Sequence, residues 1–398
     1  MLGKRGAQAL MRWTGGFALG LAALAGGPAA AADAASPVSF EATYRVDAFG
    51  PVQGGVQRRG RVLDDLDLVA DVDLGQVIGW SGASLHGYLL SNNGEAPNDD
   101  AGTLQGVDNI EVGRQGLRLY ELWLQAPVGD GTTVLAGLYD LNSEFYANDA
   151  AGLLIAPPFG IGSELAATGP NGPSIFPSTA LAIRVNHDFS AGYVRAAVLN
   201  AKAGVPGDPG GVDLDFGHGG LFIAEAGMTG PAHLAIGLWR YSASQDDLRD
   251  LTPGGDPVQR TAQGAYVLGE ATLIDGGEAG RALTGFFRVG IADGDTSPFS
   301  GGWQAGLLLD RALPGRPDSQ VSLGFQQGVL SSKMKANMAA GGVDPASAET
   351  GIELTLSDRI TPRLTLQPDL QVIFDAGGDS RADTVVVIGL RLTIDLTP

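Results

Sequence analysis

The chain has 398 residues, with 44 acidic against 25 basic side chains and a formal net charge of −19. This negative surplus argues against a nucleic-acid partner, and the absence of cysteine excludes a disulfide framework and a thiolate metal site. With 44% hydrophobic residues, 61 glycines and 17% charged residues, the composition is not that of a disordered chain. It leaves a large soluble β protein or a membrane β-barrel, because both distribute their apolar residues by alternation.

Residues 1–32 have the pattern of a secretory signal peptide. Three basic residues precede an apolar run from Phe17 to Leu24, and alanines end the segment at Ala32. The alternative is a retained anchor helix, which the several glycines of this segment disfavour. We therefore expect an exported protein whose mature part, residues 33–398, carries 22 basic and 44 acidic residues. The acidic surplus either coats a solvated surface or lines a pore that disfavours anions.

Apolar and polar residues alternate most clearly at the C-terminal end. From Thr384 to Leu396, apolar residues fill one face, whereas Gly389, Arg391 and Thr393 fall on the other. The same period of two recurs, with more exceptions in the middle of the chain, in Phe40–Phe49, Val62–Gly75, Tyr193–Leu199, Leu221–Met228, His233–Tyr241, Ala265–Ala271, Phe286–Ala292, Gly302–Leu309, Gln320–Gln327, Gly351–Ser357 and Leu364–Phe374. This period predicts β-strands with one apolar face.

The polar faces of these strands decide which kind of β protein to expect. Asp65, Asp67, Asp71 and Asp73 share one face of their segment, and such a face cannot form the dry interior of a sandwich. An antiparallel transmembrane β-barrel, apolar toward lipid and polar toward a lumen, fits better than an exported soluble β protein. Strands of ~10 residues with connections of similar length give roughly sixteen to eighteen strands.

Intervals rich in glycine, proline and aspartate separate the predicted strands. They are expected to be long external loops, with short turns at the other rim: Ser91–Gln105, Lys202–Gly219, Ser242–Thr261, Asp293–Gly301 and Lys333–Ala348. The acidic tip Asn98–Asp100 lacks the ligand order of an EF-hand and is expected to be solvated. No composition break marks a second domain.

The centre of the chain departs from plain alternation. Two strand-like segments, Leu117–Gln125 and Val134–Tyr146, enclose a short turn and precede the Gly/Pro-rich run Ala151–Val185. This order predicts a hairpin followed by a loop of functional length, which we expect to fold into the lumen.

The first of these segments shifts its phase near Tyr120. Arg118 and Tyr120 share the lumen side before the shift, and Glu121, Trp123 and Gln125 share it afterwards. A β-bulge at Tyr120 would explain the slip.

In Leu117–Gln125, Gly137–Phe145 and Phe159–Pro177 the sequence resembles the carbohydrate-selective porin family of bacterial outer membranes, the OprB type. The likeness covers the chain well from Val107 onward and loosely from Ser36 to Asp100. It implies a sixteen-stranded barrel with in-folded loops and passive, selective diffusion of small neutral sugars, without cofactor or catalysed reaction.

The resemblance also implies a location in the outer membrane of a Gram-negative-type bacterium, in contact with lipid and lipopolysaccharide. It implies insertion by the barrel-assembly machinery, which usually reads an aromatic last residue, whereas this chain ends Leu396-Thr397-Pro398. Both a monomer and a homotrimer agree with it.

A sugar channel needs aromatic faces for pyranose rings and polar groups for hydroxyls, arranged as several weak sites. The expected constriction and solute contacts are Arg118, Glu121, Trp123, Tyr139, Asp140, Asn142 and Glu144. The expected constriction-loop residues are Pro157, Phe159, Gly160, Gly169, Pro170, Asn171 and Pro173. The alternatives are an aromatic girdle for Trp123 and Tyr139, a wall-bracing ion pair between Arg118 and Glu121, and a floppy external loop.

Enzymatic readings find little support. The chain has no nucleophile elbow, metalloprotease motif or P-loop, and its four histidines, His86, His187, His218 and His233, have no ligand spacing. We therefore expect no enzyme and no metal site; an outer-membrane hydrolase with a dispersed Ser/His pair is the enzymatic alternative. The alternative from another class is a barrel plugged by its own loops, with a structural or surface-binding role.

Overall fold

The computed structural model describes residues 36–205, 208, 210–277 and 280–397, so the predicted signal peptide lies outside the described residues. The strands are β1 (Val38–Gln53), β2 (Arg61–Asp73), β3 (Ser84–Gly94), β4 (Gly116–Gly129), β5 (Thr132–Tyr139), β6 (Ala180–Phe189), β7 (Gly192–Asn200), β8 (Gly220–Met228), β9 (Ala232–Tyr241), β10 (Gln245–Leu251), β11 (Pro257–Arg260), β12 (Gln263–Ile274), β13 (Leu283–Ala292), β14 (Phe299–Asp310), β15 (Gln320–Leu330), β16 (Ala348–Thr361), β17 (Leu364–Phe374) and β18 (Val385–Asp395). The helices are α1 (Leu74–Ile78), α2 (Asn98–Ala101), α3 (Ser163–Ala166) and α4 (Ser332–Ala340), with 3₁₀ turns η1 (Leu141–Ser143), η2 (Asp149–Ala151), η3 (Pro157–Phe159) and η4 (Ala376–Gly378).

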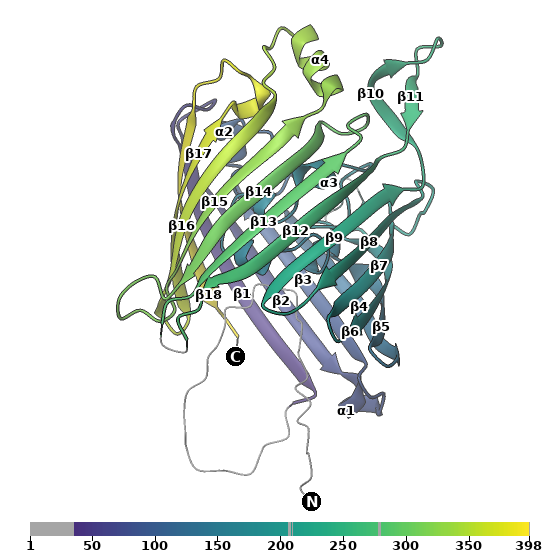
Figure 1. Cartoon of the computed structure of the whole chain (residues 1–398), viewed down its shortest axis with the longest axis vertical. Coiled ribbons are helices and arrows are strands. Elements are labelled where there is room, and N and C mark those ends of the chain that lie inside the picture. The colour runs from purple at the N-terminus through teal and green to yellow at the C-terminus, as the bar shows by residue number, and fades with distance from the viewer. Residues whose placement is uncertain (1–35, 206–207, 209, 278–279, 398) are drawn as a thin grey trace, which may run out of the picture. The chain divides into compact units, whose positions relative to one another are not determined.

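Sixteen of the described strands form one closed antiparallel barrel (Figure 1). Each strand pairs with its neighbours in sequence, β9 pairs with β12, and β1 closes the ring against β18. The short hairpin β10–β11 stands outside the ring, in the connection between β9 and β12. The predicted all-β fold and the expected strand number are confirmed.

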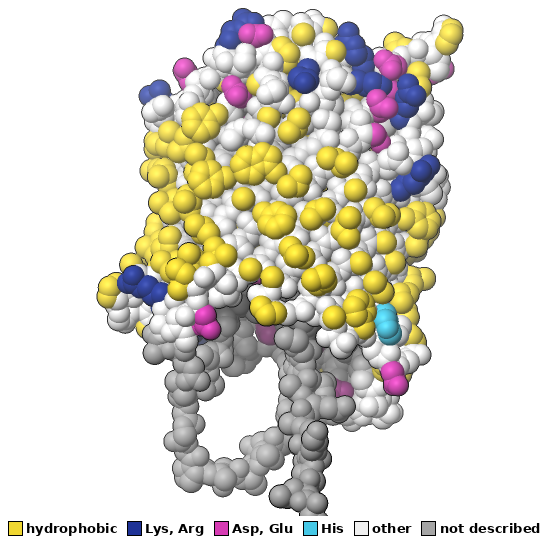
Figure 2. All heavy atoms as spheres, viewed as in Figure 1, with side chains coloured by type: hydrophobic (Ala, Val, Ile, Leu, Met, Phe, Trp, Pro, Cys, Tyr) yellow, Lys and Arg dark blue, Asp and Glu magenta, His cyan; other side chains and the backbone are white. Residues whose placement is uncertain are grey.

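Alternation places apolar side chains outside and polar ones inside. In β17, Leu370 is 39% exposed and Gln371 2%, and in β18, Leu390 is 41% exposed and Arg391 5%. Figure 2 shows the result on one face of the barrel, where apolar side chains gather across the middle and charged ones near the ends. This is the pattern of a barrel whose outer face meets lipid.

Connections at the two rims differ in length. The turns between β4 and β5, β6 and β7, and β16 and β17 contain two residues each. The long connections, including the hairpin β10–β11 and helix α4, lie at the opposite rim (Figure 1). Among the described residues, no helix is long and apolar enough to cross a bilayer.

Several predicted boundaries are wrong. The strand-like segment Val134–Tyr146 ends as a strand at Tyr139, because the Asp140 side chain accepts the Asn142 N–H and starts the 3₁₀ turn η1. The loop predicted over Ala151–Val185 instead spans residues 140–179, since β6 begins at Ala180.

Three predicted external loops also contain secondary structure. Ser91–Gln105 begins inside β3 and includes α2, Ser242–Thr261 contains β10–β11, and Lys333–Ala348 contains most of α4. Polar composition concealed these elements, because short exposed strands and helices need no apolar face.

Candidate functional site

Glycines on the inner face of β13, β14 and β15 make room for residues 140–179. A Cβ atom at Gly324 would lie 2.5 Å from the Phe159 ring and 2.6 Å from Leu154, and one at Gly290 would lie 1.7 Å from Glu164 Oε1. A Cβ atom at Gly302 would likewise lie 3.1 Å from Glu164 Oε2, whereas Gly328 makes room for Gln105 of the connection between β3 and β4. These strands therefore form a glycine-lined seat for a segment that any larger side chain would displace.

Arg288 holds that segment through its backbone carbonyls. Its guanidinium, fully buried on β13, donates to the carbonyl oxygens of Tyr146 at 2.9 Å, Gly160 at 2.6 Å and Pro158 at 3.2 Å, and also to that of Phe159. A guanidinium suits this task because it presents five donors in a rigid plane. One side chain of the wall thus fixes two distant parts of the segment.

Carboxylates on two other strands of the wall bind backbone N–H groups of the same segment. Glu353 on β16 accepts from Ile155 at 2.5 Å and from Ala156 at 2.9 Å, and Glu270 on β12 accepts from Ala150 at 3.1 Å. Glu353 is 1% exposed. A charged acceptor of this kind satisfies N–H groups that would otherwise be buried without a partner.

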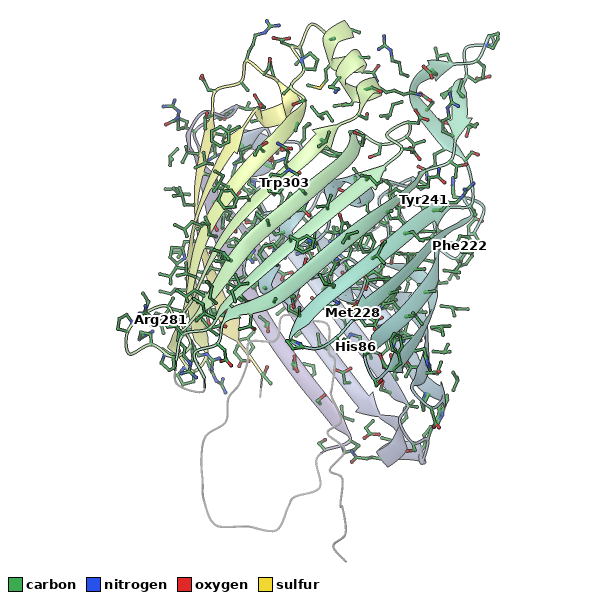
Figure 3. All side chains as sticks on the ribbon, in the orientation of Figure 1. His86, Phe222, Met228, Tyr241, Arg281 and Trp303 are labelled. Carbon is green, nitrogen blue, oxygen red and sulfur yellow. The ribbon has the colours of Figure 1, made fainter. Side chains whose placement is uncertain are left out.

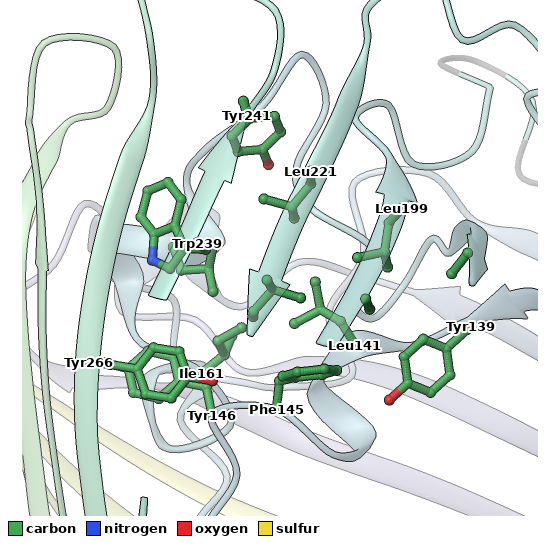
Figure 4. Close-up of a cluster of buried hydrophobic side chains, with 14 of the residues drawn as sticks. Tyr139, Leu141, Phe145, Tyr146, Ile161, Leu199, Leu221, Trp239, Tyr241 and Tyr266 are labelled. Carbon is green, nitrogen blue, oxygen red and sulfur yellow. The ribbon is translucent and has the colours of Figure 1, made fainter. Parts of the chain in front are cut away.

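Glu225 on β8 is a third carboxylate that anchors the segment, and it is surrounded by tyrosines. It accepts from the backbone N–H of Tyr146 at 3.0 Å and from the hydroxyls of Tyr193 and Tyr266, each at 2.7 Å. Tyr146 stacks on Tyr266 with 4.0 Å between ring centroids. Figure 4 shows the hydrophobic cluster around Tyr146 and Tyr266, in which Leu141, Phe145 and Ile161 of the segment join Leu199, Leu221, Trp239 and Tyr241 of the wall.

Residues 140–179 therefore cross the interior of the barrel. They leave the wall at β5 and return at β6, yet α3 contacts β13 and β14. In the ring order β14 lies seven strands from β5, nearly halfway around.

Residues 95–115, between β3 and β4, also turn inward. The Glu349 carboxylate on β16 accepts the N–H of Gln105 at 3.0 Å, and the Gln371 amide on β17 donates to the carbonyl of Val107 at 2.8 Å. Gln105 in turn accepts a hydrogen bond of 2.8 Å from Ser163 of α3. The two in-folded segments are therefore tied to each other as well as to the wall.

The bulge predicted at Tyr120 is confirmed. Tyr88 of β3 pairs with Glu121, whereas the next residue, Leu89, pairs with Leu119, so Tyr120 is the extra residue of β4. Tyr120 and Glu121 are 4% and 6% exposed, respectively. The bulge therefore turns two consecutive side chains away from lipid.

Glu121 and Trp123 belong to one cluster on the inner wall. The Trp123 ring lies parallel to the His86 imidazole, with 4.6 Å between centroids, and its Nε1 donates to Glu121 Oε1 at 3.2 Å. His86 Nδ1 lies 2.8 Å from Asp71 Oδ1, and its Nε2 lies 3.6 Å from Glu121 Oε2. Because Trp123 lies on the inner face, it is not part of an outer aromatic girdle.

Asp140 and Asn142 join this cluster at the start of the crossing segment. The backbone N–H of Asp140 donates to Glu121 Oε1 at 3.0 Å, and its carboxylate accepts from the Tyr120 hydroxyl at 2.6 Å and the Asn142 N–H at 2.8 Å. Glu121 thus links the wall to the segment that follows β5.

Tyr139 and Glu144 lie in a neighbouring cluster with two arginines. Arg184 Nε donates to Glu144 Oε2 at 2.7 Å, Arg195 donates to the Glu144 carbonyl at 2.7 Å, and the Tyr139 hydroxyl donates to the Glu144 carboxylate. Tyr139 is 1% exposed, so it too is not part of an outer aromatic girdle.

Arg118 lies apart from these clusters. Its Nη1 donates to the carbonyl of Pro177 at 3.0 Å and its Nη2 to that of Arg114 at 2.8 Å. Among the described residues it forms no ion pair with Glu121, so the bracing pair considered as an alternative does not occur. Arg118 instead fastens the end of the crossing segment to β4.

The predicted loop residues fall into two groups. Pro157, Phe159 and Gly160 lie against the glycine-lined seat, where the Phe159 ring meets the Phe286 ring edge-on. Gly169, Pro170, Asn171 and Pro173 lie at the other side, where Gly169 approaches Tyr241 and the Asn171 side chain donates to the Ala203 carbonyl. The structure therefore does not bring all seven into one place.

Sequence reasoning missed several contributors, among them Asp71 and His86 as partners of Trp123, and Arg184, Glu225, Arg288 and Glu353 as anchors. The signal that could have found the anchors is a charged residue on the polar face of an otherwise apolar strand. Arg288 interrupts Phe286–Ala292 in this way, as Glu353 does Gly351–Ser357.

Comparison with known sequences and structures gives one answer. The family of carbohydrate-selective porins called the OprB family matches residues 57–396. The chain belongs to this family. Porin B of Pseudomonas aeruginosa is 22% identical over 405 residues, which cover 89% of this chain and 86% of that protein.

Solved structures agree in fold. OprB of Pseudomonas putida, in its high-pH structure, superposes with a TM-score of 0.80 and 21% identity over 90% of this chain and 94% of that one. The outer-membrane channel DcaP of Acinetobacter baumannii has a TM-score of 0.53 and 11% identity over 90% and 97% of the two chains. This OprB-family protein is therefore an outer-membrane porin, a channel for carbohydrates.

Proposed function

We propose that residues 140–179 form the constriction of this porin and that small neutral sugars pass beside them along the inner faces of β2–β6. The supporting observation is a difference in exposure between the two sides. The side chains of Asp71 and Glu144 are 29% and 24% exposed, whereas the anchors Arg288 and Glu349 on the opposite wall are 0% exposed. Water-accessible polar groups belong to a solute path, and buried ones belong to a scaffold.

The chemistry along the proposed path suits a sugar. Trp123 supplies an aromatic ring for the apolar face of a pyranose, while Asp71 and Glu144 supply acceptors for hydroxyl groups. Because each group contributes a weak contact, a sugar would be held long enough for selection and still leave.

The test is sugar-dependent conductance of the purified porin in planar bilayers. Trp123→Ala should weaken current block by a glucose-type sugar about fivefold, since an aromatic contact contributes about 1 kcal/mol. The matched control is Trp303→Ala, whose ring lies on the outer face of β14, partly exposed (Figure 3). Equal effects of the two substitutions would contradict the proposed path, and a sealed bilayer with folded wild-type protein would contradict the channel itself.

Export and assembly complete the proposal. We infer that residues 1–32 are the export signal, supported by their basic, apolar and alanine-rich order; the mass of the mature N-terminus tests this. We infer further that the barrel-assembly machinery inserts the chain. Crosslinking in native membranes would show separately whether the porin is a monomer or a homotrimer.

A further inference from the structure

The inner wall of β1–β4 carries carboxylates around the stacked rings of Trp123 and His86. Strand register brings these groups together, because Asp71 of β2 pairs with His86 of β3 and His86 pairs with Trp123 of β4. The next row of paired residues begins at Glu41 of β1 and ends at Glu121 of β4. Figure 3 places His86 in the lower part of the barrel, toward the rim of the short turns.

Two of these carboxylates are open to water. Glu41 is exposed, and the side chain of Asp71 is 29% exposed. Asp71 uses Oδ1 for its contact of 2.8 Å with His86 Nδ1. Among the described residues, neither Asp71 Oδ2 nor the side chain of Glu41 has a hydrogen-bond or ion-pair partner. Their oxygen atoms are therefore available to a solute.

Arginines on the same inner face are already bound to other carboxylates. Arg45 of β1 pairs with Asp65 at 2.7 Å and also with Asp67. Arg184 of β6 pairs with Glu144 at 2.7 Å. These guanidinium groups are therefore not free to bind an anionic solute.

His86 compensates only part of the negative charge in this place. It lies 3.6 Å from Glu121 through Nε2 and contacts Asp71 through Nδ1, and one imidazole carries at most one positive charge. Of the three carboxylates Glu41, Asp71 and Glu121, the equivalent of two stays uncompensated beside the Trp123 ring. A cation is attracted by such charges, and an anion is repelled.

An ammonium group attached to a sugar ring fits this arrangement. Asp71 and Glu41 are diagonal neighbours on adjacent strands, whose Cα atoms lie about 7–8 Å apart, so one ammonium group between them can reach both carboxylates. A tryptophan ring also attracts a cation within about 6 Å of its centre. The hydroxyls of the same sugar can donate to the remaining carboxylate oxygens.

We propose that this part of the lumen selects protonated amino sugars of the hexosamine class, with the ammonium group between Glu41 and Asp71 and the sugar ring beside Trp123. The inference rests on the sugar path proposed above and extends its solutes from neutral to cationic sugars. Sugar acids are disfavoured by the same carboxylates. At pH 6 the amine carries its charge, because an amine beside electron-withdrawing groups has a pKa of about 8.

Block of the ion current through the mature porin by sugars, in planar bilayers at pH 6 and low salt, tests this selectivity. Glucosamine should bind about two- to fivefold more tightly than glucose, the range expected for partly exposed charge pairs, and glucuronate should bind more weakly than glucose. Asp71→Asn and Glu41→Gln should each move the glucosamine-to-glucose ratio toward one. Asp64→Asn is the matched control, because it removes a carboxylate from the outer face of the same strand, β2, and should leave the ratio unchanged.

Several outcomes would overturn the inference. A ratio near one in the wild-type porin would refute selection of amino sugars and leave the sugar path intact. An equal fall of the ratio in Asp64→Asn would assign the preference to the overall charge of the protein. Raising the salt to about 1 M, where the screening length is about 3 Å, should remove the difference between the two sugars, and a persistent difference would exclude charge as its cause. If neither sugar blocks the current, the proposed sugar path itself fails, and this inference fails with it.

Discussion

The inner wall of the barrel has two halves with different roles: one half receives the crossing segment, and the other lines the proposed solute path. On β13–β16, glycines and buried charges such as Arg288 and Glu353 receive the crossing segment. Along β2–β6, Trp123 of β4 and Glu144 at the start of the crossing segment are partly exposed to water. Both halves have a polar inner face in the sequence, so polarity alone does not separate scaffold from solute path. Backbone groups of the crossing segment bind polar side chains in both halves, Arg288 and Glu353 in one and Arg118 and Glu121 in the other. What separates the halves is that atoms of the crossing segment lie where glycines of β13–β15 lack a Cβ atom.

The largest effect on conductance is expected from Arg288→Met, in the half of the wall (β13–β16) that receives the crossing segment. Four backbone carbonyls lose their donor, and because hydrogen bonds from a charged group contribute roughly 1.5–3 kcal/mol each, the docked position of the segment should weaken by at least about 3 kcal/mol. Single-channel recording should show larger and noisier currents. Arg281→Met is the control, and an unaltered conductance in Arg288→Met would contradict the anchoring role.

The docking of the crossing segment on β13–β16 can also be disturbed by a larger side chain in the glycine-lined seat. Gly324→Leu should push Phe159 and Leu154 from the wall, at a cost of about 1–3 kcal/mol for overpacking. Protease cleavage within residues 140–179 should rise, and conductance should change as well. Gly129→Leu is the control, because a Cβ there meets no atom within 4 Å. Equal protease resistance in both variants would count against the seat.

Much of the barrel wall could be predicted from the sequence, but few of the contacts that hold the crossing segment inside the barrel could be. Period-two alternation is a local property, so it located most strands, and the phase slip at Tyr120 was visible as two inward side chains in a row. The partners of the crossing segment are not local: Arg288 is 142 residues from Tyr146, and Glu353 is 198 from Ile155. Only ring closure brings such residues together, and ring closure has no signature in a single strand.

Glu121 and Trp123 were predicted for the solute path, whereas Asp71 and His86 were not recognised as their partners. The alternation did place Asp71 on the inner face, but its neighbour across β2 and β3 follows from strand register. The spacing of histidines in the sequence was used only to search for metal sites. It could not predict that His86 stacks on Trp123.

Along β2–β6, we propose that the Asp71 carboxylate favours cations over anions, so Asp71→Asn should reduce that preference. The carboxylate is partly exposed, so the change should amount to less than about 1 kcal/mol. The reversal potential in a salt gradient should move toward zero. Asp246→Asn in the external hairpin β10–β11 controls for net charge, and an equal shift in both variants would assign the preference to the surface rather than to the lumen.

The smallest effect on permeation is expected for the ion pairs that join the external hairpin β10–β11 to α4. These contacts, here called the latch, belong to neither half of the inner wall. The buried Asp247 accepts from Arg260 Nε at 3.2 Å and from Lys333 Nζ, and Lys333 also pairs with Asp250 at 2.9 Å.

Burial alone raises the pKa of Asp247, but hydrogen bonds from Lys333 and from backbone N–H groups outweigh it and hold this pKa well below its ordinary value. A depressed carboxyl pKa stabilises the latch at every pH above the ordinary aspartate pKa of about 3.9, and this contribution is lost only as pH falls through the lower folded value. Limited proteolysis of the hairpin should therefore stay constant down to about pH 4.

Lys333→Met should open the latch already at neutral pH and raise cleavage of the hairpin, with little change in conductance, because the lumen anchors are untouched. Lys335→Met, two residues further along α4, is the matched control. A rise in wild-type cleavage between about pH 6 and pH 5 would contradict the depressed pKa, since an unpaired carboxylate of ordinary pKa would begin to lose its charge there. The latch would then be held by contacts other than the Asp247–Lys333 pair.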